Sequence, residues 1–175
     1  GDTGNEFASG DKPDLNYPGL QNEILKAAYE SGKPVVLVSL TGSAMDLSWA
    51  DEHIPAIVQA WYPGSRGGEA VARLLFGECS PEGKLPVTFY RSVEELPEFT
   101  DYSMKGRTYR YMEQEALYPF GYGLSYTEFS LSEPEITVYE GDKVSETGII
   151  RKGTGMTVRT VIRNIGKMAG GETVQ

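Results

Sequence analysis

The chain has 175 residues, of which 39% are apolar, so it is long enough for one or at most two globular domains, each with a core of its own. Its formal net charge of -9, with no basic patch, excludes nucleic acid as a partner. A single cysteine, Cys79, and a single histidine, His53, exclude an internal disulfide and a four-ligand structural zinc site, so we expect no metal and no cofactor.

The longest apolar runs, such as PVVLVSL, are much shorter than the roughly 20 residues that a membrane helix needs. Residues 1–20 lack the basic start and apolar middle of a signal peptide. We therefore expect no membrane partner, and the sequence leaves open whether the protein is cytoplasmic or secreted.

The first half of the chain alternates helical and strand patterns. Apolar residues recur at helical spacing from Leu20 to Ala28 ahead of Gly32, which predicts a helix from about residue 19 to 31. KPVVLVSL follows as a short β-branched run, the pattern of a parallel strand that is buried on both faces. An acidic turn in SWADEH precedes a second such strand, AIVQAWY, and GGEAVARLLFG predicts another helix that ends at Gly77. This order of elements indicates an α/β fold.

The second half has a different character from Glu78 onward. SPEGKLPVTFYRSVEELPEF and GRTYRYMEQEALYPFGYGLSYTEF combine turn formers with aromatic residues and show no helical period, which predicts an extended, irregular wrap over the α/β part. After Tyr126, short alternating segments such as EFSLSEPEITV and MTVRTVIRNIG are typical of a β-sandwich. We expect two domains, residues 1–125 and 126–175.

Five motifs resemble, in chain order, the C-terminal region of family 3 glycoside hydrolases of the β-xylosidase and β-glucosidase type: GKPVVLV, AWYPGSRGGEAVARLLFGECSPEGKLPVTF, GRTYRY, LYPFGYGLSYTEF and VIRNIGKMAGGETVQ. The resemblance implies part of a three-layer α/β sandwich domain, namely its C-terminal half with the trailing wrap, followed by the first strands of a fibronectin-III-like β-sandwich. It also implies a parent enzyme that hydrolyses terminal β-linked xylose or glucose residues of oligosaccharides with retention of configuration.

The two ends of the chain suggest a piece of a longer polypeptide. The polar start GDTGNEFASG has no Met, and the final GGETVQ begins an alternation too short for a useful strand. Missing strands would leave sheet edges open, so we expect a homodimer through those edges.

The catalytic residues are expected to lie mostly outside the chain. A retaining glycosidase uses two carboxyl groups about 5–5.5 Å apart. The resemblance implies an aspartate nucleophile in an absent barrel domain, and an acid/base glutamate in an acidic loop just before Gly1. Glu6 is the only glutamate in range of that loop, so it is the acid/base candidate within the chain. We expect the chain alone to be inactive.

Two residues of GRTYRY, Arg107 and Tyr109, are the candidates for substrate binding, because a guanidinium can bond sugar hydroxyls and an aromatic ring can stack on a sugar face. Pairing with the many carboxylates of the chain is the more common use of such arginines, here Arg107 and Arg110. Eight aromatic residues are candidates for a sugar platform, and most of them are expected to serve packing: Trp49, Trp61, Tyr62, Tyr109, Tyr111, Tyr118, Phe120 and Tyr122.

Other features favour structural roles over chemistry. YPGSRGGEAV resembles a phosphate cradle superficially, but it has neither a Gly-Lys-Ser/Thr ending nor a GxGxxG. We interpret it as a rigid connection in which Pro63 fixes the turn and Arg66 reaches a carboxylate or carbonyl. His53 is interpreted as solvated surface and Cys79 as an unreactive thiol. Two other classes stay open: a carbohydrate-binding or interaction module without hydrolysis, and a nucleotide-binding domain, against which the missing phosphate motifs count.

Overall fold

The computed structural model describes residues 14–98, 100–140, 143–144 and 155–174, and the chain divides into two compact units. The first unit comprises Gly1–Glu78, Gly83–Leu124 and Thr173–Gln175, and the second comprises Cys79–Glu82 and Ser125–Glu172. The expected domains 1–125 and 126–175 stay a prediction. The division adds that the short segment Cys79–Glu82 packs with residues that follow it by more than forty positions in the chain.

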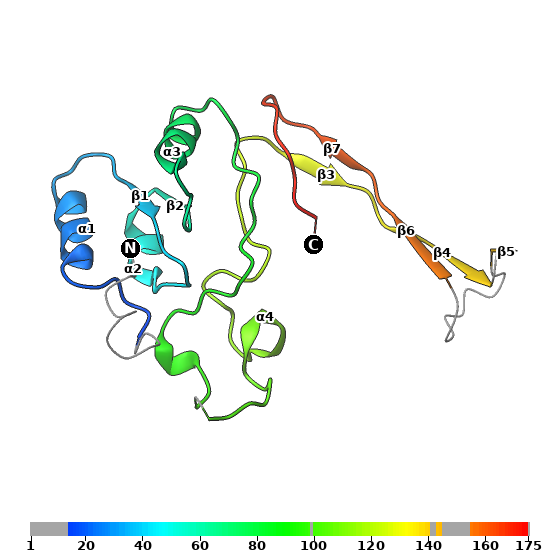
Figure 1. The fold of residues 1–175 in the computed structure, drawn as a ribbon, viewed down its shortest axis with the longest axis horizontal. Coiled ribbons are helices and arrows are strands. Elements are labelled where there is room, and N and C mark those ends of the chain that lie inside the picture. Colours follow the sequence, from blue (N-terminus) through cyan, green and yellow to red (C-terminus); the bar gives the residue numbers. More distant parts are fainter. Residues whose placement is uncertain (1–13, 99, 141–142, 145–154, 175) are drawn as a thin grey trace. The chain divides into compact units, whose positions relative to one another are not determined.

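The first unit alternates helices and strands: α1 (Gln21–Glu30), β1 (Val36–Ser39), α2 (Ser48–His53), β2 (Ala56–Gln59) and α3 (Gly67–Leu75). β1 and β2 pair in parallel, with Val36 opposite Ala56 and Ser39 opposite Gln59, and lie side by side in Figure 1. Parallel neighbours need a crossover between them, and here α2 supplies it. The unit is therefore of the α/β class.

The ends of these elements follow local backbone chemistry. Gly32 and Gly77 lie just beyond α1 and α3 with φ of +69° and +72°, the left-handed conformation in which helices often stop. The expected strand AIVQAWY is shorter in the structure, where β2 ends at Gln59. Trp61 has φ +51°, a left-handed conformation that cannot continue a strand. The expectation that the first strand is buried on both faces is wrong at its start, since Val36 keeps 46% of its surface exposed.

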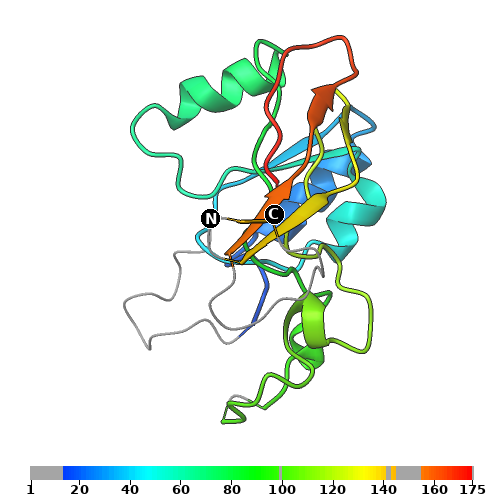
Figure 2. The ribbon, with the colours of Figure 1, turned by 90° about the vertical axis from the view of Figure 1, so that its right-hand side faces the viewer.

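The wrap is formed by two extended segments that run antiparallel. The peptide N–H of Phe89 donates to Tyr118 O at 2.8 Å, and that of Leu85 donates to Tyr122 O at 2.8 Å. Two short helices interrupt the wrap, the 3₁₀ turn η1 (Val93–Glu95) and the single α-helical turn α4 (Thr108–Tyr111), neither of which the sequence pattern predicted. In both views α4 lies at the opposite end of the unit from α3 (Figure 1, Figure 2).

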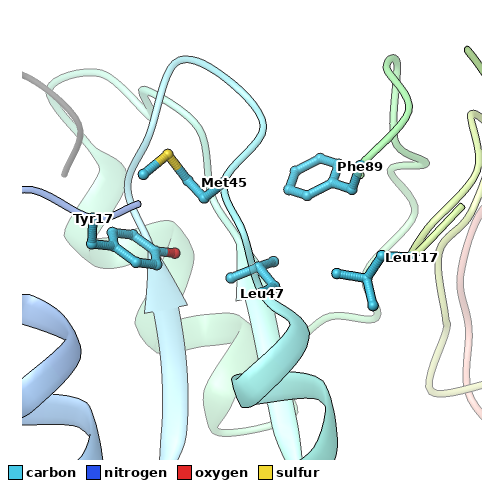
Figure 3. Packing of buried hydrophobic residues seen from close by; sticks show 5 residues of the cluster. All are labelled: Tyr17, Met45, Leu47, Phe89 and Leu117. Carbon is cyan, nitrogen blue, oxygen red and sulfur yellow. The ribbon is translucent and has the colours of Figure 1, made fainter. Parts of the chain in front are cut away.

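The core of the first unit joins the wrap to the α/β elements. Figure 3 shows Met45 and Leu47, from the loop after β1, between Tyr17 on one side and Phe89 with Leu117 on the other. Met45 and Phe89 are fully buried. Phe89 also meets Trp61 and Tyr118 edge to face, with ring centroids 6.2 Å apart in each pair. The aromatic wrap is thus held by ring burial, as its composition predicts.

The second unit is built from antiparallel pairs: β3 (Phe129–Leu131) with β7 (Ile162–Asn164), and β4 (Glu135–Glu140) with β6 (Gly155–Arg159) and β5 (Lys143–Val144). In Figure 1 the β3–β7 pair continues into the β4–β6 pair. Pro134, which has no N–H for the ladder, lies at the break between β3 and β4. At this break the Ser132 side chain joins the two strands, because its Oγ accepts the Val161 N–H at 2.9 Å. A fibronectin-III-like sandwich stays a prediction.

Candidate functional site

The catalytic candidate of the sequence, Glu6, lies outside the described residues. Within the part of the chain that the structure describes, no group of three or more histidine, cysteine and acidic side chains could hold a metal ion. The same residues include no helix that is long and apolar enough to cross a membrane. The site that can be built from the described residues is therefore the segment around α4, which carries both substrate-binding candidates.

Arg107 uses three of its five N–H donors on backbone carbonyls next to it in space. Its Nη2 donates to Asp101 O at 2.6 Å and to Glu98 O at 3.2 Å, and its Nε donates to Ser103 O at 3.2 Å. These bonds clamp the preceding loop, and the charge of Arg107 adds to the Ser103 hydrogen bonds that lower the pKa of the Asp101 carboxyl. A direct contact of Arg107 with sugar stays a prediction.

Thr108 begins α4 in a conformation that few residues of its type adopt. Its φ is +55°, in the left-handed region, where a β-branched side chain crowds the backbone. Two hydroxyl groups from the wrap bond this turn: Tyr90 Oη accepts the Thr108 N–H at 2.7 Å, and Thr88 Oγ1 accepts the Tyr109 N–H at 3.1 Å.

Four side chains after this turn form an exposed surface that we call the aromatic patch: Tyr109, Arg110, Tyr111 and Phe120. Tyr109 is 44% exposed and stacks on Phe120, with ring centroids 5.7 Å apart and ring planes 12° apart. The pKa of Arg110 is raised, first by hydrogen bonding with Tyr109 and then by the charges of Tyr109 and Tyr111. The patch offers ring faces, phenol hydroxyls and a cation, which suit a neutral polyhydroxyl ligand and provide no nucleophile.

Tyr118 and Asp51 form a second polar group on the same unit. The Tyr118 hydroxyl donates to Asp51 Oδ1, and the ring stacks on Tyr122 with centroids 4.9 Å apart. Burial raises the pKa of Tyr118, and the hydrogen bond to Asp51 adds to this shift. The phenol is therefore a donor that stays protonated at neutral pH, so it cannot act as a general base. It ties the wrap to α2.

The carboxyl ends of the two parallel strands are the usual place for a ligand in an α/β fold. Here Gln59 Nε2 donates to Thr41 Oγ1 at 2.9 Å, and Thr41 Oγ1 donates to Ser43 O at 3.0 Å. Gln59 Oε1 is buried and has no partner among the described residues. Since Thr41 is fully buried, this network closes the strand ends rather than opening them to a ligand.

His53 is not the solvated surface residue that the sequence suggested. Its ring is half-buried and stacks on Trp49, with centroids 4.5 Å apart and planes 9° apart, while its Nδ1 lies 2.8 Å from Trp49 O. Tyr29 contacts both rings edge to face. The histidine is part of the packing between α1 and α2. Cys79 is a free, half-buried thiol.

The glycine-rich segment, residues 62–71, leads from the end of β2 into α3, which begins at Gly67. Its rigidity stays a prediction. Arg66 bonds Glu69 with two nitrogens, at 2.9 Å from Nε and 2.7 Å from Nη2, which confirms a carboxylate as its partner. A Cβ atom on Gly67 would lie 2.4 Å from Pro63 Cγ, so only glycine fits under the proline ring.

Comparisons with known proteins agree with this architecture. The model of the glycosyl hydrolase family 3 C-terminal domain matches residues 2–126. A xylan 1,4-beta-xylosidase from Xylanibacter ruminicola is 46% identical over 169 residues, which are 97% of this chain and 18% of that protein. The chain belongs to glycosyl hydrolase family 3, and most of its length matches that family's C-terminal domain.

Solved structures give the same result. A β-glucosidase from Streptomyces venezuelae, determined in complex with D-glucose, matches with a TM-score of 0.69 and 32% sequence identity. The match covers 92% of this chain and 21% of the β-glucosidase. A beta-D-glucoside glucohydrolase from Trichoderma reesei has a TM-score of 0.75 at 23% identity, over 92% of this chain and 25% of its own, which indicates a shared fold. The chain spans about a fifth to a quarter of these relatives.

Proposed function

We propose that this chain is the C-terminal, non-catalytic part of a retaining β-glycosidase that removes terminal β-linked xylose or glucose residues from oligosaccharides. The match of residues 2–126 to the family 3 C-terminal domain carries the proposal. The 46% identity to a named β-xylosidase supports the xylose side, and the 32% identity to a β-glucosidase supports the glucose side.

Two carboxyl groups of the described residues are unsuited to the acid role in a retaining mechanism. A retaining mechanism needs one carboxylate nucleophile and one carboxyl group whose pKa is raised so that it can donate a proton. Among the described residues, two carboxyl groups have clearly shifted pKa values, and both shifts are downward. The Ser92 hydroxyl lowers the pKa of Glu94, and the Ser103 backbone N–H lowers that of Asp101. Neither group suits the role of acid.

The experiment compares the 175-residue chain with the full polypeptide encoded by its gene. Both are assayed with p-nitrophenyl β-D-xyloside and p-nitrophenyl β-D-glucoside. We expect hydrolysis by the full polypeptide and none by the chain. Turnover by the chain alone at the rate of the full polypeptide would contradict a non-catalytic role, and no turnover by the full polypeptide would contradict the glycosidase assignment.

The aromatic patch favours a second candidate, a carbohydrate-binding module that acts without hydrolysis. Its exposed stacked rings and adjacent cation are suited to sugar faces and hydroxyls. Calorimetric titration of the chain with xylo- and cello-oligosaccharides separates the two candidates. Binding by the chain, together with an inactive full polypeptide, would favour the module.

A further inference from the structure

The turn that begins α4 combines backbone strain with a fixed set of partners. Thr108 has φ +55°, and a β-branched residue keeps such a conformation only where the surrounding structure holds it. α4 is one turn long and has few backbone hydrogen bonds to keep it in place: the Met112 N–H donates to Thr108 O at 3.0 Å, and the Gly106 N–H donates to Tyr111 O at 3.2 Å.

Residues of the wrap stabilise the conformation of Thr108, and the core in turn fixes those residues. Side chains alternate along the extended segment Thr88–Phe89–Tyr90, so Thr88 and Tyr90 share the face opposite Phe89. Phe89 is fully buried and bridged to Tyr118, which fixes the segment. The two hydroxyls that accept the N–H groups of Thr108 and Tyr109 therefore flank a fully buried core residue.

Arg107 bonds the loop on the other side of the same turn. Its guanidinium bonds the carbonyls of Glu98, Asp101 and Ser103, so the loop before α4 cannot move without breaking these bonds. Its own N–H donates to Met104 O at 3.0 Å. Hydroxyl acceptors of the wrap therefore bond one side of the turn, and the Arg107 guanidinium bonds the loop on the other side. The residues that follow Thr108 are exposed in the aromatic patch.

We propose that Tyr90 is a positioning residue: its hydroxyl holds the left-handed Thr108 turn so that Tyr109 and Arg110 face an oligosaccharide. This inference rests on the proposed function, in which the patch belongs to a glycosidase and contacts its substrate. It assigns Arg107 to the support of the turn and Tyr109 to the contact with sugar. Tyr90 itself touches no substrate.

The test uses the full encoded polypeptide with xylobiose as substrate. Tyr90→Phe removes one hydroxyl acceptor and leaves the ring in place. We expect the KM for xylobiose to rise about three- to tenfold while kcat changes less than about twofold, because the loss affects ligand contact and not the reacting atoms. Tyr102→Phe is the matched control: it removes a hydroxyl from the loop before α4, at a side chain that is 90% exposed, and should leave both constants unchanged.

Rescue separates positioning from general damage. Asparagine adopts the left-handed region with less strain than threonine, so Thr108→Asn in the Tyr90→Phe background should restore the KM. Hydrogen exchange of the peptide that contains residues 106–112 gives a reading that does not depend on sugar. It should speed up in Tyr90→Phe and return towards the wild-type rate in the double variant.

Tyr109→Ala distinguishes the failure of this inference from that of the function. If Tyr109→Ala raises the KM and Tyr90→Phe changes neither the KM nor the exchange, the positioning role is overturned while the sugar contact stands. If Tyr109→Ala leaves the KM unchanged, the sugar contact of the patch is overturned and the inference falls with it. Restored exchange and restored KM in the double variant, with a raised KM in Tyr109→Ala, support it.

Discussion

Tyr118 shows how one residue links the wrap to the α/β elements. Its hydroxyl donates to Asp51 on α2, and its ring contacts both the core residue Phe89 and the exposed Tyr122. The pKa of the phenol is raised, first by burial and then by the hydrogen bond to Asp51. The folded chain therefore favours the protonated phenol more than the unfolded chain does.

This shift sets the direction of a pH dependence. A pKa raised on folding contributes stability that is complete below the ordinary tyrosine value, about pH 10, and is lost as pH rises above it towards the folded pKa. We expect wild type to be more stable than Tyr118→Phe at pH 8, and this advantage to shrink between about pH 10 and pH 11. Urea unfolding of both proteins across that range measures it. An advantage that does not change with pH would contradict the assigned shift.

The connection between β2 and α3 shows how neighbouring glycines can differ. A Cβ on Gly67 would lie 2.4 Å from Pro63 Cγ, and a proline ring cannot turn aside. A Cβ on Gly68 would meet nothing within 4 Å. Both residues belong to the first turn of α3, so helix propensity acts on both alike.

These two positions give a matched pair of variants. We expect Gly67→Ala to lower the free energy of unfolding by about 1–3 kcal/mol through overpacking. Gly68→Ala should leave it unchanged or raise it by up to about 1 kcal/mol, because alanine favours a helix more than glycine does. Urea unfolding compares them. Equal effects of the two substitutions would refute the steric explanation.

Local patterns predicted some elements and missed others for a physical reason. α1 and α3 follow from apolar spacing and a closing glycine, which are properties of short windows. α4 could not be found in this way, because its turn depends on hydroxyls about twenty residues away in the chain. The early end of β2 depends on the left-handed Trp61, and no residue type in that window demands this conformation.

Sugar binding by Arg107 and Tyr109 stays a prediction, and the structure distinguishes the two residues by their surroundings. Tyr109 is exposed and stacked, as a sugar platform requires. Arg107 was expected to meet sugar or carboxylates, but its partners are backbone carbonyls, and these carry no signal in the sequence because every residue has one. The contribution of Thr88 and Tyr90 becomes visible only once the wrap is folded.

The second unit depends on a segment that the chain supplies much earlier. Ser80 Oγ lies 2.8 Å from Ser125 Oγ and accepts the Tyr126 N–H at 2.9 Å, and Glu82 Oε1 accepts the Gly171 N–H at 2.7 Å. The unit is therefore closed by residues from Cys79–Glu82. A protein cut at residue 126 would lack these partners.

Ser80→Ala tests this dependence. Ser80 is buried, so Ser80→Ala removes the acceptor of the Tyr126 N–H and should lower the free energy of unfolding by about 1–3 kcal/mol. Hydrogen exchange should accelerate in β3 and β7 before it does in β1 and β2. Ser65→Ala, at an exposed serine of the loop before α3, is the control. Equal exchange rates in wild type and Ser80→Ala would show that the second unit does not need this segment.

The β4–β6 pair carries an apolar face that bears on the expected homodimer. Ile136 and Val158 are cross-strand partners with 59% and 54% of their surfaces exposed, and Thr137 and Thr157 are partners on the opposite face. If the isolated chain associates through this ribbon, burying the apolar pair drives the association.

Ile136→Thr with Val158→Thr keeps the β-branched shape and removes most of that drive, so we expect a smaller mass in light scattering at the same concentration. Thr137→Ser with Thr157→Ser should leave the mass unchanged. A wild-type chain that is monomeric throughout would overturn the homodimer, and association that survives the first double variant would place it elsewhere than on this face.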